Sequence, residues 1–227
     1  MNYLKRVYKY AFWMKDETFF SWDPAKVYNK VAKQGNYDGI IDYEKRVASL
    51  KQALKYIHQK PKNVLDLASG TGAVIDALPP STNITAVDIS KEMLAISKKR
   101  FKERKNITFI HKSFTDVTFP KNSFDLITIS YATRFIPKEN QQAFIQNITK
   151  WLKPGGVFMA VLMDSPIGTV TYYTGKLTGL PKGNNGELNY AKSFISYMSS
   201  YLSYKNTVAL PQQAPLYKPM AIFFNKQ

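Results

Sequence analysis

Residues 63–72 are Asn63-Val64-Leu65-Asp66-Leu67-Ala68-Ser69-Gly70-Thr71-Gly72. The first five are typical of a short buried strand, and the glycines allow the backbone to turn tightly and to approach a ligand closely. An apolar stretch then continues to Leu78 and is followed by Pro79-Pro80, which stops a helix. We therefore predict a strand, a glycine-rich turn and a helix, which together begin an α/β fold.

Strand and helix patterns alternate along the rest of the chain. Further strands are predicted at residues 84–87, 107–110, 124–129, 157–163 and 220–224. Helices are predicted to begin at Pro24 and after Ser90, and to span residues 42–58 and 139–152. Because strands that alternate with helices need crossover connections, we expect a mostly parallel sheet. We expect one structural domain, with an N-terminal helical lid segment at residues 1–60 and a Rossmann-like core at residues 61–227.

The composition excludes several kinds of chemistry. The chain of 227 residues contains no cysteine, which rules out disulfides, thiolate nucleophiles and cysteine-bound metals. Its two histidines, His58 and His111, lie far apart and outside any recognisable metal or triad signature. We therefore expect no metal site.

The chain is strongly basic, with 32 Lys and Arg residues against 16 Asp and Glu residues and a formal net charge of +16. Such a charge attracts nucleic acid, anionic lipid or phosphorylated substrates, although basic residues spread along a chain also suit a soluble surface. No stretch reaches the roughly 20 apolar residues of a membrane span. We therefore expect a cytoplasmic protein.

The first 22 residues combine aromatic side chains with Lys5, Arg6, Lys9 and Lys15. Such a segment suits a peripheral contact with an anionic membrane, with the rings in the headgroup layer and the cations toward the phosphates. The alternative is that these aromatic side chains pack inside the fold.

The charges around the glycine-rich turn favour one class of cofactor. Asp88 ends the second predicted strand, where a carboxylate can accept hydrogen bonds from both hydroxyls of a ribose. A dinucleotide site would have a third glycine at the position of Ile75, and the carboxylate of Asp66 would repel a diphosphate. An acidic group there suits a ligand with a cationic amine. S-adenosylmethionine carries an ammonium and a sulfonium, so it is favoured over NAD.

Four motifs resemble those of the class I S-adenosylmethionine-dependent methyltransferases. They are the stretch from Val64 to Gly72, Ala86-Val87-Asp88-Ile89-Ser90 with Met93-Leu94, Phe119-Pro120-Lys121-Asn122-Ser123-Phe124-Asp125-Leu126-Ile127, and Trp151-Leu152-Lys153-Pro154-Gly155-Gly156-Val157-Phe158. The resemblance covers about residues 23–163. It implies a Rossmann-like α/β fold, with a mostly parallel seven-stranded sheet and helices on both faces.

Within this class, the chain is most similar to the ubiquinone/menaquinone C-methyltransferase group. The likeness rests on Ala68 in the glycine-rich loop, on residues 130–136 and on the segment Val27-Tyr28-Asn29-Lys30-Val31-Ala32. It implies methyl transfer from S-adenosylmethionine to a small, lipophilic acceptor, either quinone-like or a lipid, and it ends after Met163. Two alternatives remain open. The net charge suggests an RNA methyltransferase. Ser113, which stands where the family usually has an aspartate, suggests a protein that binds the cofactor without catalysis.

The resemblance also assigns roles to individual residues. It places Asp66 near the methionine ammonium, Asp88 on the ribose, and Tyr28 over the cofactor from the N-terminal side. Ser113-Phe114 stands where the family usually has an aspartate that binds the adenine amine. The remaining expected cofactor contacts are Ala68, Ser69, Gly70, Gly72, Ile89, Met93, Ser130 and Tyr131.

No catalytic residue is assigned. Methyl transfer from a sulfonium depends mainly on proximity and alignment, and a general base is needed only where the acceptor must lose a proton. No histidine follows the fourth strand, and the candidates that remain are Tyr131 and Arg134.

Overall fold

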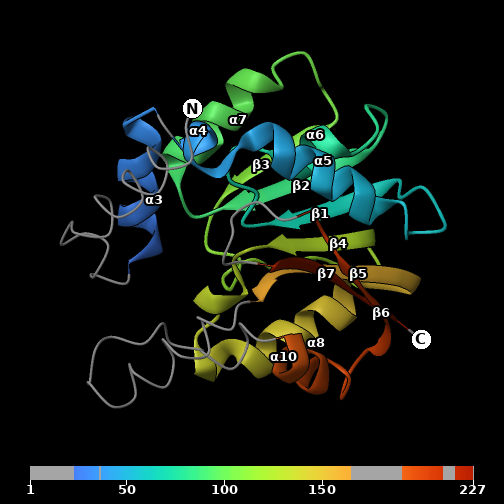
Figure 1. The fold of residues 1–227 in the computed structure, drawn as a ribbon. Helices are drawn as coiled ribbons and strands as arrows, with labels where there is room; N and C mark the ends of the chain where they lie inside the picture. Colours follow the sequence, from blue (N-terminus) through green and yellow to red (C-terminus); the bar gives the residue numbers. More distant parts are fainter. Residues whose placement is uncertain (1–22, 36, 165–190, 212–217, 227) are drawn as a thin grey trace.

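A seven-stranded sheet forms the centre of the protein, as a computed structural model shows (Figure 1). The structure describes residues 23–35, 37–164, 191–211 and 218–226. The sheet order is β3-β2-β1-β4-β5-β7-β6. In chain order the strands are β1 (Asn63–Leu67), β2 (Asn83–Asp88), β3 (Ile107–His111), β4 (Phe124–Ser130), β5 (Leu152–Asp164), β6 (Ser203–Ala209) and β7 (Lys218–Asn225).

The five neighbouring strands from β3 to β5 in this order are parallel to one another, and the direction of β7 is opposite to theirs. β1 pairs in parallel with β2 on one side and with β4 on the other. β7 is antiparallel to both β5 and β6. The prediction of a mostly parallel seven-stranded sheet is therefore confirmed.

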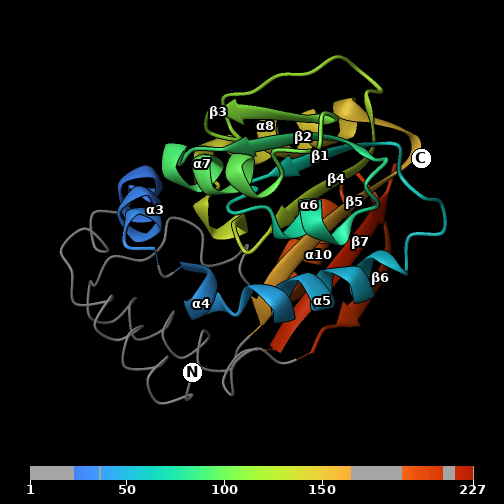
Figure 2. The same cartoon turned by 90° about the horizontal axis from the view of Figure 1, so that it is seen from above.

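Helices cover both faces of the sheet, as the two views show (Figures 1 and 2). One face carries α5 (Tyr43–Leu54), α6 (Ala73–Ala77) and α7 (Lys91–Arg100), and the other carries α8 (Gln141–Trp151) and α10 (Ala191–Met198). Each face has its own apolar core. Leu50 and Ile75 are buried in one core, and Ile148 and Phe194 are buried in the other.

Two short helices precede α5 and lie toward the carboxyl ends of the parallel strands. They are α3 (Pro24–Lys33) and α4 (Tyr37–Ile41). Asp23 caps α3 by accepting hydrogen bonds from the backbone N–H groups of Ala25 and Lys26, and Pro24 occupies the first turn. α3 packs on α7, which fixes it beside the end of β2 (Figure 2).

Some predicted boundaries differ from the structure. α5 ends at Leu54, four residues before the expected end, because Tyr56 and His58 are exposed and contribute no buried face to continue the helix. β5 begins at Leu152 and not at residue 157: Gly155, at φ +72°, donates a hydrogen bond to the carbonyl of Lys226 and so keeps the chain paired through the expected turn.

The link from β3 to β4 has no helix. Residues 112–123 pass over the sheet as an irregular segment. Phe119 fixes this segment by packing edge-on against Phe124 and Trp151, with ring centroids 5.2 Å and 5.1 Å apart. Residues 1–22, for which a membrane contact is expected, lie outside the described residues. Within the described part of the chain, no helix is long and apolar enough to cross a membrane.

Candidate functional site

The carboxyl ends of β1, β2 and β4 meet at one edge of the sheet. Because these three strands are parallel neighbours, the residues that end them lie side by side. Asp66 lies in β1, Asp88 ends β2 and Ser130 ends β4. The residues predicted from the glycine-rich motif are thus brought together at the place where open α/β sheets bind ligands.

Asp66 is a buried carboxyl group with one unpartnered oxygen. Its Oδ1 accepts a hydrogen bond of 2.8 Å from the hydroxyl of Thr128, and its Oδ2 is buried and has no partner within the part of the chain that the structure describes. Burial raises the pKa of Asp66 to about 7; the hydrogen bond from Thr128 opposes this shift and the nearby charge of Asp88 adds to it. A cationic ligand would give this carboxylate a hydrogen-bond donor for Oδ2 and an opposite charge.

Asp88 holds the glycine-rich loop in place. Its Oδ2 accepts a 2.7 Å hydrogen bond from the backbone N–H of Gly70, and its Oδ1 accepts a 2.8 Å bond from that of Ser90. Burial raises its pKa, and the two backbone hydrogen bonds oppose this shift. The carboxylate therefore joins the loop after β1 to the start of α7.

The loop conformation depends on positive φ angles. Ala68, Gly70 and Gly72 have φ angles of +55°, +55° and +95°, which carry the chain from β1 into α6. The backbone N–H of Ser69 donates to the carbonyl of Val87, which ties the loop to β2. A side chain at Gly72 would collide with Phe101, whose Cε2 would lie 2.4 Å from an added Cβ.

Two more polar groups at this edge lack partners. The hydroxyls of Ser69 and Ser130 are buried without a hydrogen-bond partner among the described residues. Buried polar groups are normally paired, so an unpaired set gathered at one edge requires an explanation. Together with Asp66 Oδ2, these hydroxyls are free to bind a polar ligand.

Tyr131 follows β4 in an unusual backbone conformation. Its φ is +59°, which is uncommon for a residue with a bulky side chain, and its N–H is held by the carbonyl of Val161 at 2.8 Å. The other catalytic candidate, Arg134, lies in the short 3-10 helix η1 (Thr133–Phe135), but its side chain is outside what the structure describes.

An arginine that sequence analysis missed contacts Tyr131. The guanidinium of Arg46 in α5 lies 4.5 Å from the ring centroid of Tyr131, and its Nη1 donates a 3.3 Å hydrogen bond to the hydroxyl of Tyr37. The ring of Tyr28 packs edge-on against Tyr37 and Phe135, at 6.1 Å and 5.9 Å. The ring of the predicted residue Tyr28 therefore contacts both α4 and η1, the 3-10 helix that follows β4.

The sequence carries a signal for Arg46. It is four residues from Leu50 and seven from Ala53, both fully buried, so a cation falls on the apolar stripe of the helix. Such a position indicates a role other than a solvated surface charge.

A second missed group ties α4 to the loop. Thr71 donates a 2.6 Å hydrogen bond to Asp38 Oδ1, and Arg100 forms an ion pair with the same carboxylate. Arg100 also donates a 2.6 Å hydrogen bond to the carbonyl of Thr71. α4 is in this way fastened to the glycine-rich loop and to α7.

The two adenine contacts expected after β2, Ile89 and Met93, differ in how deeply they are buried. Ile89 is half-buried, and its carbonyl lies 3.0 Å from Nε2 of His111. Met93 is 1% exposed and packs against Val31 and Ala32 of α3.

The residues after β3 turn toward other partners. The hydroxyl of Ser113 bonds that of Thr115 at 2.7 Å, and Phe114 packs edge-on against Phe144 of α8. The Ser113 hydroxyl and the Phe114 ring are therefore both engaged by neighbouring side chains of the protein.

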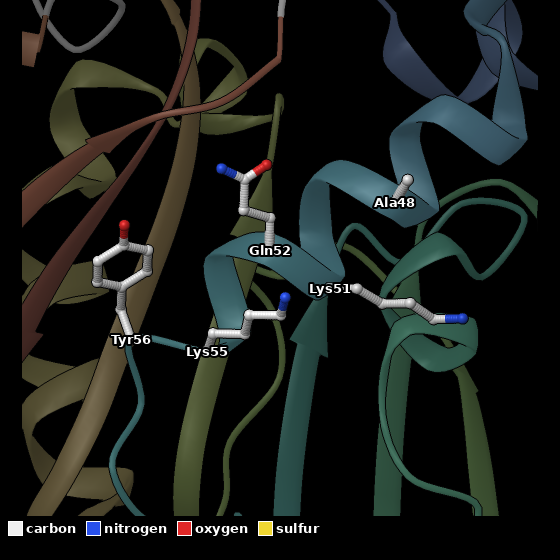
Figure 3. Close-up of a pocket in the computed structure, with 5 residues that line it drawn as sticks. All are labelled: Ala48, Lys51, Gln52, Lys55 and Tyr56. Atoms are coloured by element: carbon white, nitrogen blue, oxygen red, sulfur yellow. The ribbon is translucent and has the colours of Figure 1, made fainter.

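A hollow lies on the surface of α5, away from these residues. It measures about 570 Å³ and is lined by exposed residues of α5 and the turn after it, Ala48, Lys51, Gln52, Lys55 and Tyr56 (Figure 3). Its lining includes none of the predicted site residues. Among the described residues, no group of three or more His, Asp or Glu side chains could hold a metal ion.

Comparisons with known proteins agree with this arrangement. A family described as a methyltransferase domain matches residues 64–156. The chain is 30% identical over 151 residues to a demethylmenaquinone methyltransferase from Listeria welshimeri, and this match covers 62% of each protein. The chain therefore matches less than two thirds of the length of such curated relatives.

Solved structures share the fold at low identity. An N-methyltransferase, NodS from Bradyrhizobium japonicum, in complex with S-adenosyl-L-homocysteine, has a TM-score of 0.66 at 16% identity, over 88% of this chain and 98% of that one. A geranyl diphosphate C-methyltransferase from Streptomyces coelicolor has a TM-score of 0.60 at 11% identity, over 79% of this chain and 76% of that one. Residues 64–156 thus match a methyltransferase domain, and the chain as a whole shares the fold of solved methyltransferases.

Proposed function

We propose that this protein transfers the methyl group of S-adenosylmethionine to a small, lipophilic, quinone-like acceptor. The observation that carries the proposal is the pair of buried carboxyl groups, Asp66 and Asp88, at the ends of adjacent parallel strands. The relatives named demethylmenaquinone methyltransferase support the quinone-like acceptor.

The residues at this edge fit the cofactor. Asp66 Oδ2 and the hydroxyls of Ser69 and Ser130 have no hydrogen-bond partner in the described ranges, and the ammonium and carboxylate of a methionine moiety offer complementary groups. In this proposal Asp88 accepts hydrogen bonds from the ribose hydroxyls, in addition to those that it receives from Gly70 and Ser90. Ile89 and Met93 form the apolar side of the adenine position, and the backbone of Ala68 and Gly72 lies alongside.

When it is bound, the cofactor supplies a methyl group that is already activated by its sulfonium. The protein contributes alignment and the exclusion of water. The ring of Tyr28 packs against Tyr37 and Phe135, and the guanidinium of Arg46 lies over the rings of both Tyr37 and Tyr131. An aromatic acceptor can stack on such side chains.

Tyr131 is a candidate for the general base that would remove a proton from the methyl acceptor. Tyr131 follows Ser130 directly, and its backbone is fixed by the bond to Val161. No histidine lies after β4, so we assign the general base, where the acceptor needs one, to Tyr131 or to solvent.

The test combines binding and product analysis. Calorimetry is expected to detect S-adenosylmethionine and S-adenosylhomocysteine but not NAD or NADP; tight binding of NAD alone would refute the cofactor. The protein is then incubated with labelled cofactor and either a demethylated naphthoquinol or total RNA, and methylated products are identified by mass spectrometry. Methylated quinol supports the proposal, methylated RNA favours the alternative suggested by the net charge, and binding without any product favours a non-catalytic role.

A further inference from the structure

We propose that the protein binds single-stranded nucleic acid on a surface remote from the cofactor site. This surface joins the hollow on α5 to the amino edge of the sheet, which is the edge where the five parallel strands begin. The proposal goes beyond the proposed function and does not depend on it, because neither the glycine-rich loop nor the carboxyl ends of the strands take part.

The topology of the chain brings many lysines to the amino edge. The five parallel strands begin within residues 55–63, 79–83, 101–107, 120–125 and 149–156. Lys226 lies at the same edge, because β7 is antiparallel and ends there. Burial lowers the pKa of Lys226, and the cation of Lys121 adds to this shift. The lysines of the five segments are Lys55, Lys60, Lys62, Lys102, Lys105, Lys121, Lys150 and Lys153.

Few acidic groups balance these cations. The same five segments contain two acidic residues, Glu103 and Asp125. Each already has a lysine beside it, since Lys153 lies 2.8 Å from Asp125 and Lys102 lies 3.7 Å from Glu103. The other lysines of this edge have no carboxylate partner within the part of the chain that the structure describes. The amino edge is therefore a surface that attracts polyanions.

The exposed stripe of α5 adds an aromatic ring to these charges. Tyr56 is 42% exposed, while its ring rests against Phe223 of β7 at a centroid distance of 6.3 Å. The ring is thus held in place by the core and still offers surface to a ligand. With a spacing of three or four residues, the members of the stripe follow one another along the hollow of about 570 Å³ (Figure 3): Ala48, Lys51, Gln52, Lys55 and Tyr56.

Each group of this surface matches a part of a nucleotide. Bases stack on exposed aromatic rings such as Tyr56, and lysines contact the phosphates between the bases. The amide of Gln52 both donates and accepts hydrogen bonds, as the edge of an unpaired base requires. The hollow also falls within the range of roughly 300–1,000 Å³ that is usual for small-ligand sites, so it has room for a base.

An anionic membrane would match the charges but not the side chains. A helix that lies on a bilayer buries large apolar side chains among the lipids. α5 turns its apolar residues inward, where Val47, Leu50 and Ala53 are buried in the core. Its exposed stripe offers lysines, an amide and one ring around a hollow, which suits an inserted base better than a flat layer of headgroups. The observations therefore favour nucleic acid.

The amino edge lies at the opposite ends of the strands from the cofactor site. β1 and β2 have 5 and 6 residues. At about 3.3 Å per residue, the two edges are therefore roughly 15–20 Å apart. A strand that is bound at the amino edge does not bring its bases to the transferred methyl group, so we expect it to be bound without being methylated there.

Fluorescence anisotropy with a labelled single-stranded RNA of about 12 nucleotides tests the inference without any cofactor. We expect the protein to bind this strand more tightly than a duplex of the same sequence, whose paired bases cannot stack on Tyr56. Tyr56→Ala should weaken binding of the single strand by about fivefold or more, because one stacked base is lost. Tyr56→Phe keeps the ring and should bind as the unmodified protein does.

A double variant, Lys51→Gln with Lys55→Gln, tests the charges. The loss of two phosphate contacts should lower the affinity and reduce the slope of its logarithm against the logarithm of salt concentration by about 1.4. The matched control, Lys91→Gln with Lys112→Gln, removes the same charge from exposed positions that follow the carboxyl ends of β2 and β3, and should keep the slope. If thermal unfolding shows that Tyr56→Ala does not fold, these two double variants carry the test.

Two polyanions without bases provide the competing outcomes, namely vesicles of anionic phospholipid and polyglutamate. Absence of RNA binding, or an equal loss of affinity in the two double variants, would overturn the inference. So would vesicle or polyglutamate binding that needs Lys51 and Lys55, in a protein that binds single strands and duplexes equally well. Calorimetry with S-adenosylhomocysteine keeps the two proposals apart, because a protein that binds RNA at this surface but no adenosyl ligand contradicts the proposed function alone.

Discussion

Cofactor binding should weaken as the pH falls through neutrality, because Asp66 must lose its proton to attract a cationic amine. Burial raises the pKa of Asp66 to about 7 in the ligand-free protein, so below that pH the group is mostly neutral. A bound ammonium favours the carboxylate and lowers this pKa again. Binding below pH 7 is then coupled to the release of a proton.

The size of the effect follows from this pKa. With a free-protein pKa of about 7 and a bound value well below 6, the affinity at pH 6 is about tenfold lower than at pH 8. Calorimetry with S-adenosylhomocysteine measures this ratio directly. Titrations at pH 6 in two buffers with different ionisation enthalpies should reveal close to one released proton.

Two variants identify the group that titrates. Asp66→Asn should bind weakly, and its affinity should not change between pH 6 and pH 8. His111→Gln removes a histidine whose ring lies beside the carbonyl of Ile89. In this variant the affinity for S-adenosylhomocysteine should depend on pH as it does in the unmodified protein. An unchanged affinity across this range, or a slope that survives in Asp66→Asn, would refute the role of Asp66.

Three further predictions concern stability and the loop. Because the pKa of Asp66 is raised on folding, its contribution to stability is present below pH 4 and is lost as the pH rises through about 7. Chemical denaturation should therefore show that Asp66→Asn is more stable than the unmodified ligand-free protein at pH 8, but not at pH 4. Asp88→Ala removes the acceptor for Gly70 and for a ribose, and should cost roughly 2–3 kcal/mol of S-adenosylhomocysteine binding, whereas an unchanged affinity would mean that the ribose lies elsewhere. Gly72→Ala places a Cβ against Phe101 at positive φ and should lower the free energy of unfolding by about 2–5 kcal/mol. Gly70→Ala has open space around its Cβ, so its free energy of unfolding should fall by only about 1–2 kcal/mol. Equal losses of stability in the two variants would contradict the steric explanation.

The sequence by itself determined the class of fold and the central motif. Apolar runs that end in Asp66 and Asp88, separated by a glycine-rich turn, specify parallel strands and a ligand edge because both periodicity and turn chemistry are local properties. The caps of α3 and α7 were predictable for the same reason, since Asp23 and Ser90 act on backbone groups two or three residues away. The roles assigned to the individual site residues stay predictions until ligands are measured.

Elements without a local apolar signal needed the tertiary structure. β6 alternates poorly, and its residues are mostly half-exposed, so only pairing with β7 makes it a strand. β5 starts five residues early because Lys226, distant in sequence, supplies the hydrogen-bond partners for its first turn. Such pairing depends on groups that meet only after folding.

The partners of charged side chains were likewise decided by the tertiary structure. Asp38 and Arg100 are 62 residues apart in the chain, yet they form the ion pair that fastens α4 to α7. Arg46 lies on an apolar stripe that is visible in the sequence, but its stacking on Tyr131 depends on the chain turn after β4. Periodicity fixes which face of an element is buried, whereas only the packed fold fixes which side chain from another element meets it there.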